Sequence, residues 1–135
     1  MSEQTYICFD YGEKRIGVAV GQTLTGTATP LETIRVINGK PDWEKITGLI
    51  RQWQPEALVV GLPVHMDDSR QAITDSAEKF SRQLEGRYLL RVFRAEERLS
   101  TYEARDRLKR NRDLDPVAAQ VILESWLLEK TNRID

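Results

Sequence analysis

The chain is poor in several residue types, and each shortage excludes a class of protein. Cys8 is the only cysteine, so no internal disulfide can form, and a reducing compartment, the cytoplasm, is expected. No run approaches the roughly 20 apolar residues that a membrane span needs. The opening residues MSEQTY lack the basic and apolar regions of a secretory signal. His65 is the only histidine, and we interpret it as a loop residue.

The rest of the composition is that of one folded domain, residues 1–135, with 40% apolar and 30% charged residues. The net charge of −1 hides an uneven distribution: residues 1–86 carry −3, residues 87–112 carry +5 and residues 113–135 carry −3. Such a basic block can contact phosphates, although a solvated strand and helix face would show the same pattern. Both interpretations stay open.

Apolar periodicity and turn residues predict strands at 5–10, 16–21, 31–37, 57–63 and 89–94, and helices at 42–53, 69–85, from 100 to about 110, and from 115 onward. Gly12 is expected to take a positive φ in the first turn. Ser100 begins a capping box, STYE, and Asp115 with Pro116 begins the last helix. The element order predicts an α/β fold: a mixed five-stranded sheet, three antiparallel strands followed by two parallel ones, with helices on both faces.

Three acidic residues could carry chemistry. Asp10 closes the first strand, Glu97 follows the strand 89–94, and Asp115 opens the last helix. A turn, an exposed loop and a helix cap would explain them singly. Together they lie at strand ends, where open sheets form their sites. Three carboxylates supply the oxygen ligands that Mg²⁺ or Mn²⁺ prefers, and two such ions about 4 Å apart activate water and stabilise a leaving phosphodiester oxygen.

Two further acids compete for this role near the C-terminus. Asp113 lies on the preceding loop, and Glu124 follows Asp115 by nine residues. At about 100° per residue, nine residues place Glu124 half a turn away, so the two cannot face one site. We prefer Asp115 and interpret Glu124 as a surface or supporting residue.

Four motifs in order resemble the signatures of the bacterial YqgF/RuvX family: FDYGEKRIGVAVG, VVGLPVHMDDS, EERLSTYEA and DPVAAQVILESWL. The likeness covers residues 6 to 128. It implies the RNase H-like fold and a nuclease that matures the 5′ end of pre-16S ribosomal RNA. The family was formerly described as Holliday junction resolvases, which act on branched DNA.

The resemblance also implies residue roles. The family's acidic residues fall on Asp10, Glu97 and Asp115, and Arg98 matches an arginine that could stabilise phosphate charge. Where relatives often have Asp-Glu-Arg, this chain has Glu96 before Glu97, so which glutamate is the ligand stays open. The segment RNRDLD is shorter than in many relatives.

Other residues near these motifs have supporting interpretations. Lys14 and Arg15, in the turn after Asp10, could hold the substrate backbone, although solvated turn charges would look the same. Gly61 and Pro63 are expected to shape a loop beside the site. Ser100 and Thr101 are interpreted as capping residues.

Competing functions remain. DYGEKRIGVAVG also resembles the first phosphate loop of actin-like ATPases and sugar kinases, but those proteins need two such domains and an adenosine-binding segment. A non-catalytic RNA-binding module is a further alternative. These residues do not separate structured precursor RNA from branched DNA, because Trp43, Trp53 and Trp126 are better explained by packing than by base stacking.

A junction resolvase normally acts as a dimer, and no dimer interface is evident, so RNA processing ranks first. We expect a monomer or weak dimer that acts on nucleic acid, with ribosomal proteins or the pre-ribosome as partners and no membrane.

Overall fold

The computed structural model describes residues 4–67, 70–109 and 112–132. Positions 68–69, at the start of the second predicted helix, and 110–111, in RNRDLD, lie outside the described residues, as does the side chain of Thr101. The elements are β1 (Thr5–Tyr11), β2 (Arg15–Gln22), β3 (Ala28–Ile37), β4 (Lys40–Pro41), α1 (Trp43–Trp53), β5 (Ala57–His65), α2 (Ala72–Tyr88), β6 (Arg91–Leu99), α3 (Thr101–Lys109), the 3₁₀ turn η1 (Arg112–Leu114) and α4 (Asp115–Asn132). None of the helices in these residues has the length and apolar character needed to cross a membrane.

The strands form one mixed sheet in the order β4-β3-β2-β1-β5-β6. β2 pairs antiparallel with β1 and β3, whereas β5 lies parallel to both β1 and β6. The predicted sheet, three antiparallel strands followed by two parallel ones, is confirmed. The predicted count of five is not, because Asn38 and Gly39 have φ values of 53° and 74°. Two positive φ values form the tight turn of a hairpin, which returns the chain to pair β4 with β3.

The first turn differs from its prediction. Gly12 was expected to have a positive φ, but it does not. Among the described residues, the glycines with a positive φ are Gly26 and Gly39. A side chain is excluded at Gly12 for another reason: its Cβ would lie 2.7 Å from the carbonyl oxygen of Arg15. The turn therefore needs glycine for close approach of the backbone.

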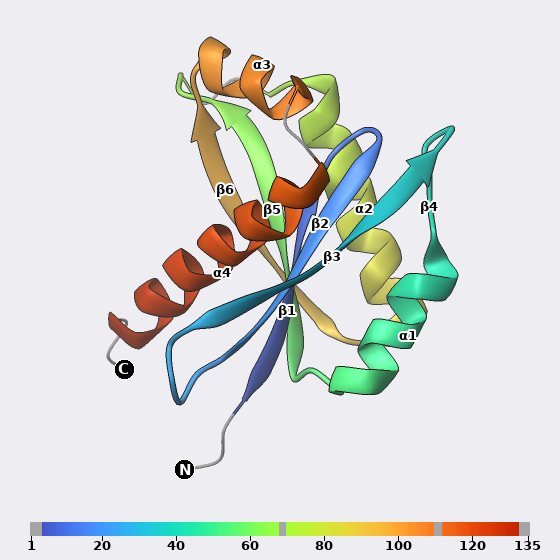
Figure 1. The fold of residues 1–135 in the computed structure, drawn as a ribbon, viewed down its shortest axis with the longest axis vertical. Helices are drawn as coiled ribbons and strands as arrows, with labels where there is room; N and C mark the ends of the chain where they lie inside the picture. Colours follow the sequence, from blue (N-terminus) through green and yellow to red (C-terminus); the bar gives the residue numbers. More distant parts are fainter. Residues whose placement is uncertain (1–3, 68–69, 110–111, 133–135) are drawn as a thin grey trace.

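The sheet separates two apolar layers, because successive residues of a strand point to opposite faces. Phe9 of β1 packs with α1 and α2 on one face, and Cys8 packs with α4 on the other. Figure 1 shows α1 and α2 on one side of the sheet and α4 crossing the other side. Trp43 and Trp53 pack against the first layer and Trp126 lies in the second, which confirms that packing accounts for the tryptophans.

β6 is longer than predicted. It was expected over 89–94 with Glu96 and Glu97 in the following loop, but it continues to Leu99 and stays paired with β5. The loop prediction is therefore wrong. β6 is the edge strand of the sheet, so its charged side chains can reach solvent while its main chain stays hydrogen-bonded to β5.

β5 also extends past its predicted end at Pro63. Its first eight residues are buried, as expected for a strand covered on both faces. Gly61 and Pro63 lie within the strand and His65 ends it, so the loop interpretations of these three residues are wrong. The parallel ladders with β1 and β6 on either side keep this segment extended.

The two helices at the end of the sheet begin close to their predicted positions. In the predicted capping box, the N–H of Glu103 donates to Ser100 Oγ and the N–H of Ser100 donates to Glu103 Oε1, each at 3.1 Å. η1 leads into α4, which begins at Asp115. Figure 1 shows α3 at the end of the sheet toward which β5 and β6 run, and α4 crossing the face of the sheet below it.

Candidate active site

Three predicted acids come from three elements to the face of the sheet that α4 covers. Asp10 lies two residues after Cys8, and Glu97 lies two residues after Ala95, so each shares the face of its predecessor. Cys8 and Ala95 both belong to the apolar layer packed on α4. Asp115 is the first residue of α4.

Asp10 is flanked by glycine on both neighbouring strands. It lies opposite Gly17 of β2 and opposite Gly61 of β5. Residues opposite one another carry their side chains on the same face, so the two glycines let other groups approach the sheet beside Asp10. Asp10 is only 3% exposed. A carboxylate buried to this extent needs a cation or hydrogen bonds to remain ionised.

The Glu97 carboxylate reaches across β5 toward β1. A Cβ built at Gly61 would lie 3.1 Å from Glu97 Oε1 and 3.0 Å from the Cδ1 atom of Ile122, so Glu97 occupies the space above the glycine. Burial, and then the negative charge of Glu97, raise the pKa of the Cys8 thiol well above its ordinary value. Glu97 therefore approaches Asp10 from the β6 side.

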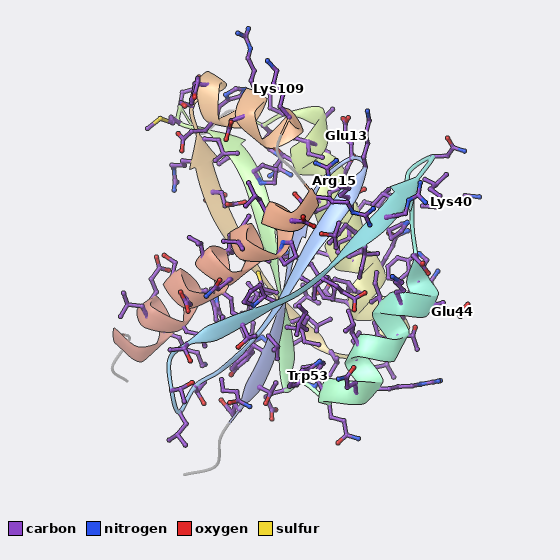
Figure 2. The ribbon with its side chains drawn as sticks, viewed as in Figure 1. Glu13, Arg15, Lys40, Glu44, Trp53 and Lys109 are labelled. Atoms are coloured by element: carbon purple, nitrogen blue, oxygen red, sulfur yellow. The ribbon has the colours of Figure 1, made fainter. Side chains whose placement is uncertain are left out.

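Asp115 approaches from the β2 side. A Cβ at Gly17 would overlap the main-chain carbonyl oxygen of Asp115, so the first turn of α4 rests directly on β2. Arg15 Nε donates to Asp115 Oδ2 at 2.7 Å. Figure 2 shows Arg15 at the start of β2, beside the first turn of α4. The Asp115 main chain thus lies next to the glycine that faces Asp10.

The competing acids occupy other places. Glu96 points to the face opposite that of its neighbour Glu97, and it forms an exposed ion pair with Arg98 at 3.6 Å. Glu124 accepts a hydrogen bond from the N–H of Ala28 at 3.0 Å, at the start of β3. Asp113 is exposed in η1. Glu97 is therefore the glutamate on the Asp10 face.

The predicted substrate-binding residues are not gathered in one patch. Lys14 is exposed in the turn between β1 and β2. Arg15 is only partly exposed and is bound to Asp115. Arg98 is exposed at the end of β6. Lys14 and Arg98 have the exposure that a contact with a phosphate backbone requires.

Part of the basic block 87–112 holds the fold together. Arg94 of β6 forms ion pairs with Glu78 at 2.8 Å and with Glu85 at 3.0 Å, both on α2. The Arg87 guanidinium lies 4.0 Å from the centre of the Trp43 ring. These cations are engaged with neighbouring side chains, so the block is not a uniform surface for a polyanion.

Two surface grooves meet at Glu97. One, of about 710 Å³, follows β6 between α2 and α4, and the other, of about 400 Å³, lies between α3 and α4. Glu97 and Val121 line both grooves, whereas Asp10 and Asp115 line neither. Glu97 is thus the acid of the three that is reached from the surface grooves.

The donors suit a hard divalent cation, since carboxylate oxygens are its preferred ligands. Within residues 4–67, 70–109 and 112–132, no three or more His, Cys, Asp or Glu side chains are grouped as a metal site. Asp115 instead has Arg15 as its cation. The residue types and their common face suit a divalent ion.

Sequence reasoning missed Gly17 and the contact between Arg15 and Asp115. A glycine inside the apolar strand pattern RIGVAVG is a signal of close backbone approach, so Gly17 was open to detection. The ion pair joins residues 100 positions apart, and no local pattern encodes it.

Two solved structures define the class of fold. RuvC from T. thermophilus, in complex with a Holliday junction substrate, superposes with a TM-score of 0.59 at 15% identity, over 96% of each chain. Pelota from Archaeoglobus fulgidus gives a TM-score of 0.51 at 13% identity, over 96% of this chain and 37% of that one. At such identities the likeness concerns the fold alone, and with the sheet described above it defines an RNase H-like α/β domain.

Sequence comparison gives the family. Residues 4–129 match the family described as "RuvX: Holliday junction resolvase". A protein of Nitrosococcus oceani is 50% identical over 90% of this chain and 85% of its own length, and one of Pseudomonas paraeruginosa is 48% identical over 92% of both. One of Hydrogenovibrio crunogenus is 50% identical over 93% of this chain and 94% of its own length. All three bear the name "Putative pre-16S rRNA nuclease". The chain belongs to the RuvX family, as its motifs implied.

Proposed function

We propose that this chain is a metal-dependent nuclease that hydrolyses phosphodiester bonds in maturing the 5′ end of pre-16S ribosomal RNA, in the cytoplasm. Relatives named for that substrate share about half of its residues, and the alignments cover 85% or more of their length. The observation that carries the proposal is structural: Glu97 and Asp115 approach Asp10 from opposite sides, each over a glycine.

We assign Asp10, Glu97 and Asp115 as the residues that hold Mg²⁺ or Mn²⁺. Such ions, when bound, supply an activated water and stabilise the leaving oxygen. Mg²⁺ keeps several of its own waters, so few protein carboxylates suffice. Asp10 provides a buried carboxyl group, and Glu97, which lines the surface grooves, is the acid that a nucleic-acid strand meets first.

We assign Lys14 and Arg98, two exposed cations, to substrate phosphates, Arg98 through the groove along β6 that it lines together with Glu97. A nucleic-acid backbone is held mainly by such contacts, which fix its position without reading its sequence. Ribosomal proteins or the pre-ribosome are the partners that this function requires, since the substrate is assembled with them.

Cleavage of a structured precursor RNA that carries the 5′ extension tests the proposal. We expect wild type to cut it with Mg²⁺ or Mn²⁺ and to stop when EDTA is added. Asp10→Asn and Glu97→Gln should lower the rate by orders of magnitude. Glu96→Gln is the matched control, because it makes the same change one residue away on the opposite face of β6, and it should remain within a few-fold of wild type.

A parallel assay with a four-way DNA junction separates the other functions. Symmetrical cutting of the junction with the RNA left intact would replace RNA by branched DNA as the substrate, in line with the family description. RNA binding that needs no metal, produces no cleavage and survives Asp10→Asn would show a binding module and overturn the nuclease proposal.

A further inference from the structure

We propose that Arg15 is a positioning residue for Asp115: it holds the carboxylate in the orientation in which that group binds a divalent ion. This inference rests on the proposed metal-dependent nuclease and adds a residue to its site. It gives Arg15 a different role from the substrate contact that the sequence predicted.

β2 contacts Asp115 at two points. Gly17 lies against the main chain of Asp115, and Arg15 binds its side chain at Oδ2. Positions 15 and 17 are two residues apart on one strand, so both contacts are made from the same face of the sheet. The backbone and the carboxylate of Asp115 are thereby placed by one rigid element, next to the residue opposite Asp10.

The ion pair has the properties of a fixed contact. The Nε–Oδ2 distance of 2.7 Å is that of a charge-assisted hydrogen bond, and the Asp115 side chain is 8% exposed. The pair Arg98–Glu96 differs on both counts, with a distance of 3.6 Å and 52% exposure of each side chain. Exposed pairs of that kind are screened by water and hold neither partner in one geometry.

A carboxylate that accepts a hydrogen bond from arginine can also act as a metal ligand. An ionised carboxylate has about four acceptor positions on its two oxygens, and the Nε–H of Arg15 uses one of them, on Oδ2. Carboxylates that bind metals are commonly oriented by a hydrogen bond from a neighbouring residue, and loss of that neighbour costs about 10- to 100-fold in metal affinity. Arg15 occupies that place beside Asp115.

Mn²⁺ binding measured from the electron paramagnetic resonance signal of the free ion tests this role. Titrations use the full chain, at a temperature where circular dichroism shows each variant folded. We expect Arg15→Gln to weaken Mn²⁺ binding about 10- to 100-fold. Arg15→Lys, which keeps the charge without the planar donor, should lie between Arg15→Gln and wild type. Arg70→Gln, the control that breaks the exposed ion pair with Asp75, should stay within twofold of wild type.

A double-mutant cycle locates the effect. In an Asp115→Asn background, Arg15→Gln should change Mn²⁺ affinity little further, because the group that it orients is gone. If the Gln variant does not fold, the Lys variant in the same cycle gives the result.

The opposing results are distinct. Unchanged Mn²⁺ affinity in folded Arg15 variants would make the ion pair structural and overturn this role. Tighter binding would show that Arg15 competes with the ion, and would also overturn it. Both results leave the proposed nuclease standing, since wild type still binds metal. Wild type that binds no Mn²⁺ would overturn the metal site and this inference together.

Discussion

The main chain of Gly17 lies directly against that of Asp115, at the position of β2 opposite Asp10. No side chain fits at Gly17, because its Cβ would overlap the Asp115 carbonyl oxygen. A glycine therefore sets the distance between α4 and the sheet at the candidate active site. The same device recurs across β1, where Gly61 admits the Glu97 carboxylate.

Gly17→Ala should destabilise the fold, because the added methyl group meets backbone that cannot rotate away. Overpacking of this kind costs about 1–3 kcal/mol or more in the free energy of unfolding. Urea denaturation monitored by circular dichroism measures it. Gly48→Ala is the control: nothing lies within 4 Å of its Cβ, and alanine in the middle of α1 should stabilise by about 0.5–1 kcal/mol. Equal midpoints for Gly17→Ala and wild type would contradict the contact.

Gly61→Ala should affect activity more than stability. Its Cβ would lie 3.1 Å from Glu97 Oε1 and 3.0 Å from Ile122 Cδ1, and both atoms are side-chain ends that can shift. The free energy of unfolding should fall less than for Gly17→Ala. The nuclease rate should fall about 10- to 100-fold, since small displacements of a catalytic group have such effects. Rate and denaturation midpoint are to be measured on one preparation, and a fully active Gly61→Ala would show that the position of Glu97 does not matter.

The start of α3 should weaken in acid. Hydrogen bonds from Ser100, first from its main-chain N–H and then with its hydroxyl group, hold the pKa of Glu103 below its usual value of 4.5. Because the folded pKa lies below the unfolded one, the capping contribution is present above about pH 4.5 and is lost as the pH falls through the folded value. NMR titration of the Glu103 carboxyl group, with amide exchange at Ser100, measures the step.

Glu103→Gln provides the control for this titration. The variant has no carboxyl group at this position, so amide exchange at Ser100 should lose its acid step. A Glu103 pKa at or above 4.5 in wild type would contradict the capping contact.

Local patterns in the sequence determined most of the elements and their order. The run YICFDY, apolar on both faces, predicts a central strand, and the capping box at Ser100 predicts where α3 begins. These signals depend on the spacing of apolar side chains and on hydrogen bonds between near neighbours in the sequence. They can therefore be recognised without knowing which segment the element will pack against. The motifs also indicated the three acids, although nothing in their spacing shows that they share a face.

Only the tertiary structure decided which residues lie beside those acids. EERL reads as a loop by composition, but pairing with β5 extends β6 through it and turns Glu97, not Glu96, toward Asp10. Arg15 and Asp115 are 100 residues apart and become partners only because Gly17 lets α4 settle on β2. Side-chain period and capping act over a few residues, whereas strand pairing and close helix packing join distant segments. The elements therefore follow from the sequence, and the site follows from their assembly.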